Sequence, residues 1–265
     1  MIELSINDGV AEIVLNAPEK LNALNEDALT ELDAAYDDAA AAATLPFGAE
    51  GAVRALLIRG EGRAFCAGRD IAGVDGANDD ARGYLEGLLA PLLQKMAAFP
   101  APTFAAAQGA CLGVGLGLLI AMDVVYVAEN AKFGSPFGNL GATLDSGGHW
   151  LFTETLGAHR TLDLVYTSDL ISGSEAVAAG LFSRAMPAEG LVDFTRAAAI
   201  KAAAGPTLAF NASKTLVAAI RRERLGLWDA VVLENEAQVA LSATADYAEG
   251  FAAFTAKRKP GFTGK

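Results

Sequence analysis

Residues Thr103–Ala128 read TFAAAQGACLGVGLGLLIAMDVVYVA, and this stretch decides the fold. Two short apolar segments, Thr103–Ala107 and Asp123–Ala128, are typical of buried strands. Between them lie a glycine-rich turn at Gly109–Gly117 and an expected helix at Leu116–Met122. Because two strands joined through a helix form the unit of a parallel sheet, the stretch predicts an α/β protein.

The same alternation of strands and helices extends to both sides of this stretch. It ends at Gly190, beyond which every segment reads as helical. The sequence therefore predicts an α/β core over residues 1–200 and a helical region over residues 201–265. The other expected elements are a hairpin at Ile2–Leu15, a helix at Asn25–Ala43 capped by Asn25, a strand at Val53–Arg59, helices at Arg82–Phe99, Gly147–Leu156, His159–Thr167 and Gly173–Ala179, a strand at Leu181–Met186, and a last helix at Thr244–Arg258.

Composition excludes several classes of protein. With 52% hydrophobic and 20% charged residues, the 265-residue chain is expected to fold into a globular core. A net charge of -12 argues against a nucleic-acid partner, and no apolar run is long enough to predict a membrane span. The two cysteines, Cys66 and Cys111, and the absence of a leader pattern favour the cytoplasm. Only His149 and His159 are present, so no metal site is expected.

Two glycine-rich segments could carry chemistry. Gly60–Asp70 reads GEGRAFCAGRD and follows a predicted strand. It could be a tight connection, or it could turn its amides toward a ligand oxygen, and the sequence leaves both open. Gly109–Gly117 has the spacing G-x-G-x-G, which does not match the dinucleotide-binding pattern. The start of the helix after it could instead hold a developing oxyanion.

The segment Phe133–Trp150 reads FGSPFGNLGATLDSGGHW and contains one acid, Asp145. Asp145 could cap the following helix, or it could be a catalytic carboxylate. His149 lies four residues later, but no serine or cysteine nucleophile is placed for a catalytic triad and no G-x-S-x-G pattern is present. The local sequence leaves the two readings of Asp145 open.

Taken together, these motifs resemble the enoyl-CoA hydratase/isomerase (crotonase) superfamily over nearly the whole chain. Each is only moderately specific, but their order and spacing make a strong match. The motifs are Pro18-x-x-Leu-Asn22-Ala-Leu, Phe65-Cys-Ala-Gly-x-Asp70, the Gly109–Gly117 turn followed by Asp123, Phe133-Gly-x-Pro136, Asp145-Ser-Gly-Gly148 and Phe254-x-x-Lys-Arg-Lys-Pro-x-Phe-Thr-Gly264.

The resemblance implies a crotonase-like spiral of repeated ββα units with a C-terminal helical region that serves oligomerisation and part of the CoA site. It implies an acyl-CoA substrate, no further cofactor, and a homotrimer or hexamer. The thioester oxygen would be held by the backbone amides of Arg69 and Val114. Phe254 and Lys257 match positions that reach a neighbouring subunit's CoA. The implied CoA- and substrate-binding residues are Lys20, Leu21, Ala23, Ala67, Gly68, Asp70, Ile71, Leu112, Gly113, Phe137, Leu140, Trp150, Phe254 and Lys257.

The chain departs from the hydratases of this family at two positions. Their two water-positioning glutamates correspond to Gly117 and Phe137 here, which argues against ordinary hydratase activity. Asp145 instead matches the acid of the isomerase branches, namely the Δ3,Δ2-enoyl-CoA isomerases and the 1,2-epoxyphenylacetyl-CoA isomerase of phenylacetate breakdown.

One carboxylate suffices for a 1,3-proton shift through a thioester enolate, so Asp145 is predicted to act as acid and base. Leu140, Leu144, Phe137 and Trp150 are expected to desolvate it and raise its pKa. Two alternatives remain: a hydrolytic or dehalogenating acyl-CoA enzyme with Asp145 as nucleophile, and a non-catalytic acyl-CoA-binding relative.

Overall fold

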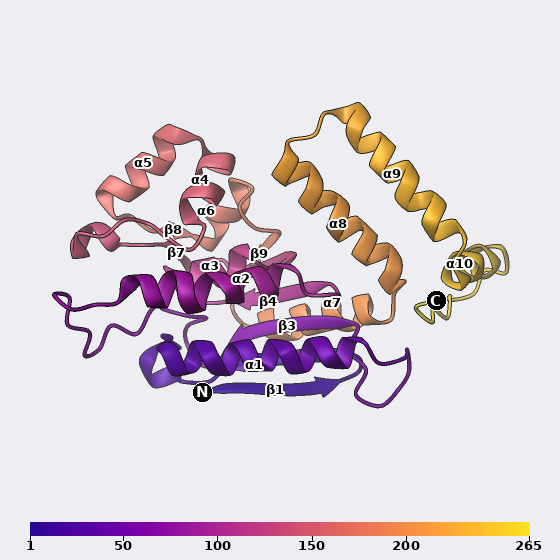
Figure 1. Ribbon diagram of the computed structural model, residues 1–265, viewed down its shortest axis with the longest axis horizontal. Coiled ribbons are helices and arrows are strands. Elements are labelled where there is room, and N and C mark those ends of the chain that lie inside the picture. The colour runs from indigo at the N-terminus through magenta and orange to yellow at the C-terminus, as the bar shows by residue number, and fades with distance from the viewer.

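The computed structural model describes residues Met1–Lys265, and its core is built on a six-stranded sheet (Figure 1). The first two strands pair antiparallel, and every later strand is parallel to its neighbour. The strand order is β1 (Ile2–Asn7), β2 (Val10–Leu15), β3 (Ala55–Gly60), β4 (Thr103–Ala107), β6 (Val124–Ala128) and β9 (Arg184–Met186).

A second, three-stranded sheet consists of β5 (Ala110–Leu112), β7 (Lys132–Gly134) and β8 (Ile171–Ser172). The chain contributes a strand to the large sheet, then one to the small sheet, and then a helix. This sequence recurs in β4-β5-α3 and in β6-β7-α4, which confirms the repeated ββα units. The helices of this region are α3 (Val114–Ile120), α4 (Gly148–Leu156), α5 (Ala158–Thr167) and α6 (Gly173–Ala178).

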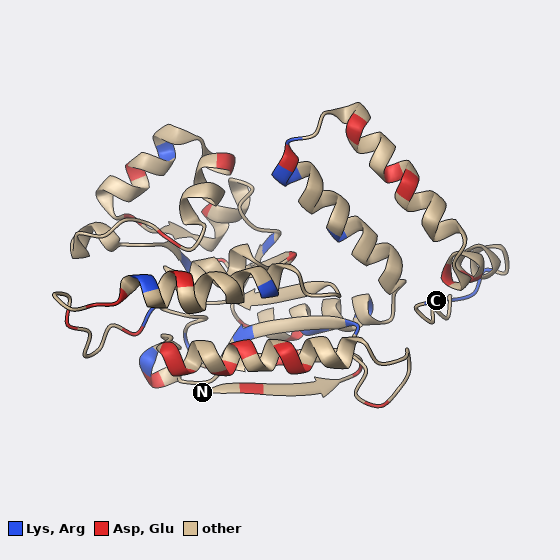
Figure 2. Cartoon of the chain, viewed as in Figure 1, with Lys and Arg blue, Asp and Glu red and all other residues tan.

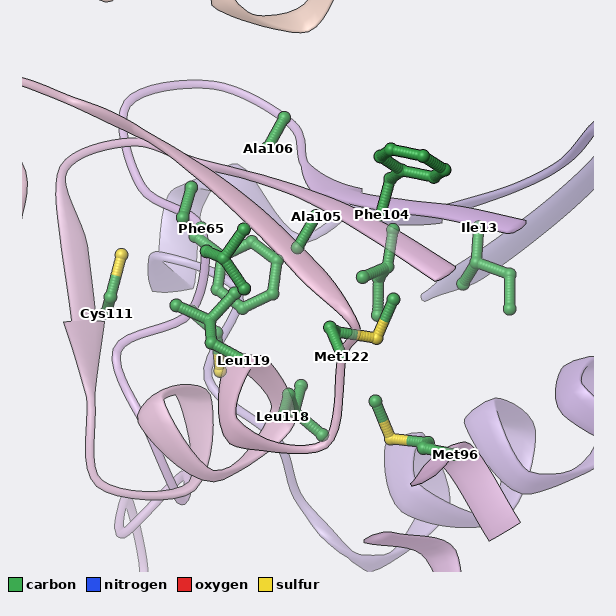
Figure 3. Close-up of a cluster of buried hydrophobic side chains, with 14 of the residues drawn as sticks. Ile13, Phe65, Met96, Phe104, Ala105, Ala106, Cys111, Leu118, Leu119 and Met122 are labelled. Atoms are coloured by element: carbon green, nitrogen blue, oxygen red, sulfur yellow. The ribbon is translucent and has the colours of Figure 1, made fainter. Parts of the chain in front are cut away.

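Helices cover both faces of the large sheet, so its central strands are buried on both sides. All five residues of β4 are buried. In Figure 3, Ala105 points toward Leu119 and Met122, whereas Phe104 and Ala106 point to the opposite face. This alternation is the normal geometry of a strand. The covering helices are α1 (Glu26–Ala43), the π-helix η2 (Gly83–Leu89), which continues into α2 (Ala90–Ala97), and α7 (Leu191–Ala203).

Acidic residues concentrate on the outward face of α1, where Figure 2 shows them from its start onward but not in its alanine-rich last turn. Asp27, Glu31, Asp37 and Asp38 are exposed there, while Leu29 and Leu32 face the core. This face is solvated, in agreement with its sequence pattern, and it accounts for part of the net charge of -12.

The last three helices, α8 (Thr207–Glu223), α9 (Leu227–Ser242) and α10 (Ala245–Thr255), project away from the sheets (Figure 1). Only α8 is fastened to the core by polar contacts. Lys214 Nζ lies 3.0 Å from Asp123 Oδ2 and donates to the Phe99 carbonyl at 3.0 Å, and Asn211 donates to the Pro100 carbonyl. No helix combines the length and the apolarity that a membrane crossing requires.

Three boundaries differ from the sequence-based expectations. The predicted helix at 82–99 begins as the π-helix η2, which hydrophobic periodicity does not distinguish from an α-helix. The expected glycine-rich turn contains strand β5, and α3 already begins at Val114. The last helix ends at Thr255, and the segment after it folds back, with the Asp246 carboxylate accepting the amides of Thr263 and Gly264.

The buried side chain of Asn22 joins two loops next to the first helix. Its Oδ1 accepts the amide of Ala17 at 2.8 Å, and its Nδ2 donates to the carbonyls of Glu61 and Ala64 at 3.0 and 2.8 Å. Asn22 has a φ of 57°, a left-handed conformation that asparagine tolerates better than most residues. These contacts explain why an asparagine stands at this position.

We predict that Asn22→Ala lowers the free energy of unfolding by about 2 kcal/mol, because the buried Ala17 amide loses its partner and the Ala64 and Glu61 carbonyls each lose a donor. Urea unfolding followed by circular dichroism measures the change. The control is Asn16→Ala, which removes an exposed hydrogen bond to Glu3 and is expected to cost no more than about 0.5 kcal/mol. Equal effects of the two substitutions would contradict the assignment.

Candidate active site

The candidate site is built on two loops that run side by side in register. Cys66 and Cys111 form a parallel β-bridge: the Cys66 amide donates to the Ala110 carbonyl and the Leu112 amide to the Cys66 carbonyl, both at 3.0 Å. Three residues after each cysteine come Arg69 and Val114. The register therefore carries these two residues to the same end of the paired loops.

The backbone amides of Arg69 and Val114 are free. Neither donates a hydrogen bond within the chain. A Cβ built on Gly68, the residue before Arg69, would lie 3.8 Å from the Val114 nitrogen, so the two loops are in van der Waals contact at this point. Two unpaired donors side by side are chemically suited to one oxygen that carries negative charge.

Glycine is required for this close approach at two places. A Cβ on Gly115 would lie 2.3 Å from the Cys66 carbonyl oxygen. A Cβ on Gly109 would lie 1.9 Å from the Arg63 carbonyl oxygen, and Gly109 also has a φ of 60°. The glycines therefore serve backbone geometry, and that geometry leaves the two amides free.

Asp145 does not cap a helix. Helix α4 has Gly147 at its N-cap, with no side-chain capping bond, so the capping interpretation is wrong. The Asp145 carboxylate accepts a hydrogen bond from its neighbour instead, Ser146 Oγ to Oδ1 at 2.7 Å. Ser146 has a φ of 54°, so the turn between Asp145 and α4 has a conformation that serine rarely adopts.

Burial raises the pKa of Asp145 above its ordinary value, and this is the largest influence on it. The hydrogen bond from Ser146 and the nearby charges of Arg69 and His149 act in the opposite direction. The apolar surroundings are less complete than expected: Leu144 is buried, but Trp150 is 44% exposed. Leu140 is 62% exposed on the 3-10 helix η3 (Phe137–Leu140) and does not enclose the carboxylate.

Of the two positions where the resemblance places hydratase glutamates, Gly117 lies within α3 and Phe137 packs against its N-cap residue, Gly113. A Cβ on Gly117 would lie 2.5 Å from Ser146 Cβ, so the segment that carries Asp145 occupies the space of a side chain there. The ring of Phe137 lies against Gly113, where an added Cβ would come within 2.8 Å of Phe137 Cζ. Phe137 thus lies at the N-cap of α3, before the free Val114 amide, and the turn of Asp145 and Ser146 packs one turn further along.

A cavity of about 1190 Å³ opens beside Asp145 and runs between α2, α3, α4 and α8. Two acids line it, and Asp123 is already paired with Lys214, which leaves Asp145 as the acid without an ion-pair partner. Its wall near Asp145 is closed by Arg221, whose guanidinium lies 4.2 Å from the Trp150 ring centroid. The apolar lining includes Leu85, Leu89, Leu93, Ile120, Phe210 and Val217.

The segments expected to hold CoA lie together along the same loops. The Ala67 amide donates to the Leu21 carbonyl at 2.9 Å, and Lys20 Nζ lies 3.1 Å from Asp70 Oδ2. This pairing brings the segment from Lys20 to Ala23 beside the one from Ala67 to Ile71, and Leu112 and Gly113 follow on the paired loop. Ile71 is exposed.

Phe254 and Lys257 lie apart from this group. Phe254 is on α10 and is 85% exposed, and Lys257 follows the helix. Figure 1 shows α10 at the opposite side of the molecule from α3 and α4. The structure therefore does not bring these two residues to the loops of the same chain.

Sequence reasoning missed two contributors to the site. Ser146 carries the hydroxyl that contacts Asp145, and its position next to the only acid of the segment was the available signal. Helix α8 supplies one wall of the cavity, although the sequence assigned this region only to oligomerisation and CoA binding. No local sequence pattern predicts that α8 lines the cavity, because its position depends on where Lys214 and Asn211 attach it to the core.

Comparisons with known proteins agree with this architecture. A family model described as enoyl-CoA hydratase/isomerase matches residues 5–265. A Rhodobacter capsulatus protein named "probable enoyl-CoA hydratase" is 36% identical, over 100% of this chain and 98% of its own. The 1,2-epoxyphenylacetyl-CoA isomerase of Escherichia coli is 32% identical, over 98% and 97% of the two chains. A crystal structure of an enoyl-CoA hydratase from Bacillus anthracis superposes with a TM-score of 0.86 at 27% identity, covering 100% of this chain and 99% of that one.

We predict that Asp145→Asn raises the melting temperature at pH 7. A carboxyl group whose pKa is higher in the folded than in the unfolded protein destabilises the fold when ionised, and this loss of stability develops as the pH rises through the two pKa values. Differential scanning calorimetry at pH 7 and at a pH near 4 measures the difference, which should shrink at the lower pH. Asp163→Asn, at an exposed acid, is the control. A lower melting temperature for Asp145→Asn at pH 7 would contradict the prediction.

Proposed function

The chain belongs to the enoyl-CoA hydratase/isomerase family, and within it we propose an acyl-CoA isomerase that moves a carbon–carbon double bond. One observation carries the proposal. A single carboxylate with a raised pKa, Asp145, precedes Ser146, which packs against Gly117 one helical turn beyond the free amide of Val114, and no second carboxylate accompanies it at positions 117 and 137. The relatives carry names of hydratases and of isomerases, so the choice rests on these residues.

The proposed reaction is a 1,3-proton shift. Ionised Asp145 removes a proton from the carbon next to the thioester carbonyl, and the electron pair of that C–H bond delocalises over the carbonyl oxygen and the adjoining double bond. Protonated Asp145 then returns the proton two carbons further along, which places the double bond beside the carbonyl. A raised pKa suits both steps, because it makes the carboxylate a better base than a free aspartate, whose pKa is about 3.9.

The amides of Arg69 and Val114 would stabilise the enolate oxygen. They are unpaired and lie at the same end of the paired loops, so both are free to donate hydrogen bonds to one oxyanion. Loss of one such donor typically costs a factor of about 10²–10³ in rate. The proposal assigns the CoA moiety to the loops that carry Lys20–Ala23 and Ala67–Ile71.

Water addition is disfavoured at this site by packing as well as by residue type. Ser146 fills the space beside Gly117, and Phe137 places an aromatic ring at the other position. A hydratase must hold and deprotonate a water molecule, and the groups available here besides Asp145 are a serine hydroxyl and an exposed His149.

We further propose a homotrimer or hexamer in which Phe254 and Lys257 reach a neighbouring subunit's CoA. Apolar side chains on the projecting helices support this, since Val217, Trp228, Val239 and Phe254 are all more than half exposed. Exposed apolar residues gathered on one region of a protein are typical of an interface.

We predict that Asp145→Asn lowers the conversion of a 3-enoyl-CoA to the 2-enoyl-CoA by at least about 10³-fold, because the base is removed. Ultraviolet absorbance of the conjugated thioester measures the reaction on a panel of straight-chain and aryl CoA esters. Binding of a saturated acyl-CoA, measured by calorimetry, should persist, and Asp163→Asn should leave both properties unchanged.

Three outcomes, each from its own measurement, would overturn the isomerase proposal. Full activity of Asp145→Asn would remove Asp145 as the base. A covalent acyl or aryl adduct on Asp145, detected by mass spectrometry, would indicate a hydrolytic or dehalogenating enzyme. No exchange of the proton next to the carbonyl in heavy water, with any ester that binds, would indicate a binding protein.

We also predict that Ser146→Ala shifts the acid limb of the pH–rate profile to higher pH. The wild-type acid limb should already lie above the pKa of a free aspartate, because burial raises the pKa of Asp145. The Ser146 hydroxyl donates to the carboxylate and favours its ionised form, so its removal raises that pKa further. Ser135→Ala, which removes another hydroxyl near the site, should leave the limb in place. A limb that moves to lower pH would contradict the assignment.

A further inference from the structure

The side chain of Arg69 has a role that its backbone amide does not explain. Its two terminal nitrogens donate to the two carboxylate oxygens of Asp79 at 2.8 and 2.7 Å. The guanidinium also lies 4.2 Å from the ring centroid of Tyr84. The Arg69 and Asp79 side chains are 22% and 24% exposed, so this bidentate pair is partly shielded from water, although Asp79 lies in an exposed segment.

The buried ring of Tyr84 packs against this arginine and holds its guanidinium in place. It is fully buried, and its hydroxyl donates to the Leu24 carbonyl at 3.1 Å. Leu24 is itself paired with the loop of Arg69, because its amide donates to the Gly68 carbonyl and its carbonyl accepts the Asp70 amide. The arginine is thus held between a buried ring and the loop that presents the free amides.

Asp79 belongs to a segment that is otherwise attached only to itself. Residues 71–80 are exposed, and apart from the Arg69 pair every hydrogen bond of residues 71–82 stays within residues 70–89. The segment leads directly into η2, whose Leu85 and Leu89 line the cavity beside Asp145. One ion pair therefore connects the loop of the free amides to the segment that enters the cavity wall.

We propose that Arg69 is a positioning residue whose guanidinium, held between Asp79 and Tyr84, fastens residues 71–82 to the loop of the free amides, and whose positive charge acts on Asp145. The second part of this proposal rests on the proposed function, whereas the fastening of the segment does not. The charged and titratable groups around Asp145 are Arg69, His149 and Tyr84. The cavity beside it is also lined by the paired Asp123 and Lys214 and by Arg221, Arg222 and Arg224.

The two partners of the pair give opposite electrostatic effects when they are removed. In Asp79→Asn the arginine remains but loses its counter-charge, so its attraction for the Asp145 carboxylate increases and the pKa of Asp145 falls. In Arg69→Gln the positive charge is lost and the pKa of Asp145 rises, because Arg69 lowers it in the wild type. A merely structural role would move both variants in the same direction or not at all.

The test uses the full chain with Asp79→Asn, Arg69→Gln and the control Glu86→Gln. Glu86 also pairs with an arginine, but that pair with Arg82 is exposed and lies within one helix. Hydrogen exchange followed by mass spectrometry should show at least about tenfold faster exchange over residues 71–82 in both Asp79→Asn and Arg69→Gln. The control should match the wild type.

The pH profile of proton exchange from a saturated acyl-CoA provides the second measurement. We expect the acid limb to move to lower pH in Asp79→Asn and to higher pH in Arg69→Gln. Wild-type exchange rates over residues 71–82 in both variants would overturn the fastening role, and acid limbs that move in the same direction would overturn the electrostatic role. The hydrogen-exchange measurement does not depend on the reaction, so it tests the fastening role even if the isomerase proposal is wrong.

Discussion

The parallel pairing of Cys66 with Cys111 is the constraint on which the rest of the site depends. It fixes two loops from different repeats in register and carries the amides of Arg69 and Val114 to one end. The approach is possible only because Gly109 and Gly115 have no side chains, since added Cβ atoms would lie within 2.3 Å of backbone oxygens. Backbone hydrogen bonding and steric fit thus place two free donors without the help of a charged group.

Asp145 gains its properties from what surrounds it and not from the helix that follows. Gly147 takes the N-cap position, so the Asp145 carboxylate does not bond to the helix. It accepts a hydrogen bond from Ser146, it is influenced by the positive charge of Arg69, and it lines the cavity. Burial raises its pKa while these two neighbours limit the rise. A carboxylate balanced in this way can exchange a proton in either direction, which is what moving a double bond requires.

Much of the fold could be predicted from the sequence. The Asn25 cap, the strands β1, β2, β4 and β6 and the helices after Gly190 follow from local patterns, because hydrophobic periodicity and capping residues are local signals. Strands β7 and β8 could not be found in this way, since they contain three and two residues. The π-helix η2 could not be found either, because its apolar pattern resembles that of an α-helix.

For the site, sequence reasoning identified the residues but not all of their roles. The motifs predict that Arg69, Val114 and Asp145 form one site; in the structure Arg69 and Val114 lie on paired loops, and Ser146, next to Asp145, packs against α3. They could not indicate that the arginine side chain pairs with Asp79, that Leu140 is exposed, or that α8 walls the cavity. Each of these depends on contacts between segments distant in the sequence, such as Lys214 with Asp123, and no local pattern encodes them.

The attachment of α8 has a consequence for how such a protein can diverge. In the proposed reaction the reacting groups come from the paired loops and the turn before α4, whereas much of the cavity wall comes from α2 and α8. Substitutions at wall positions such as Leu93 or Val217 can change the size and shape of the acyl group accepted without touching the groups that move the proton. The acyl group accepted can therefore change while the groups proposed to move the proton stay the same.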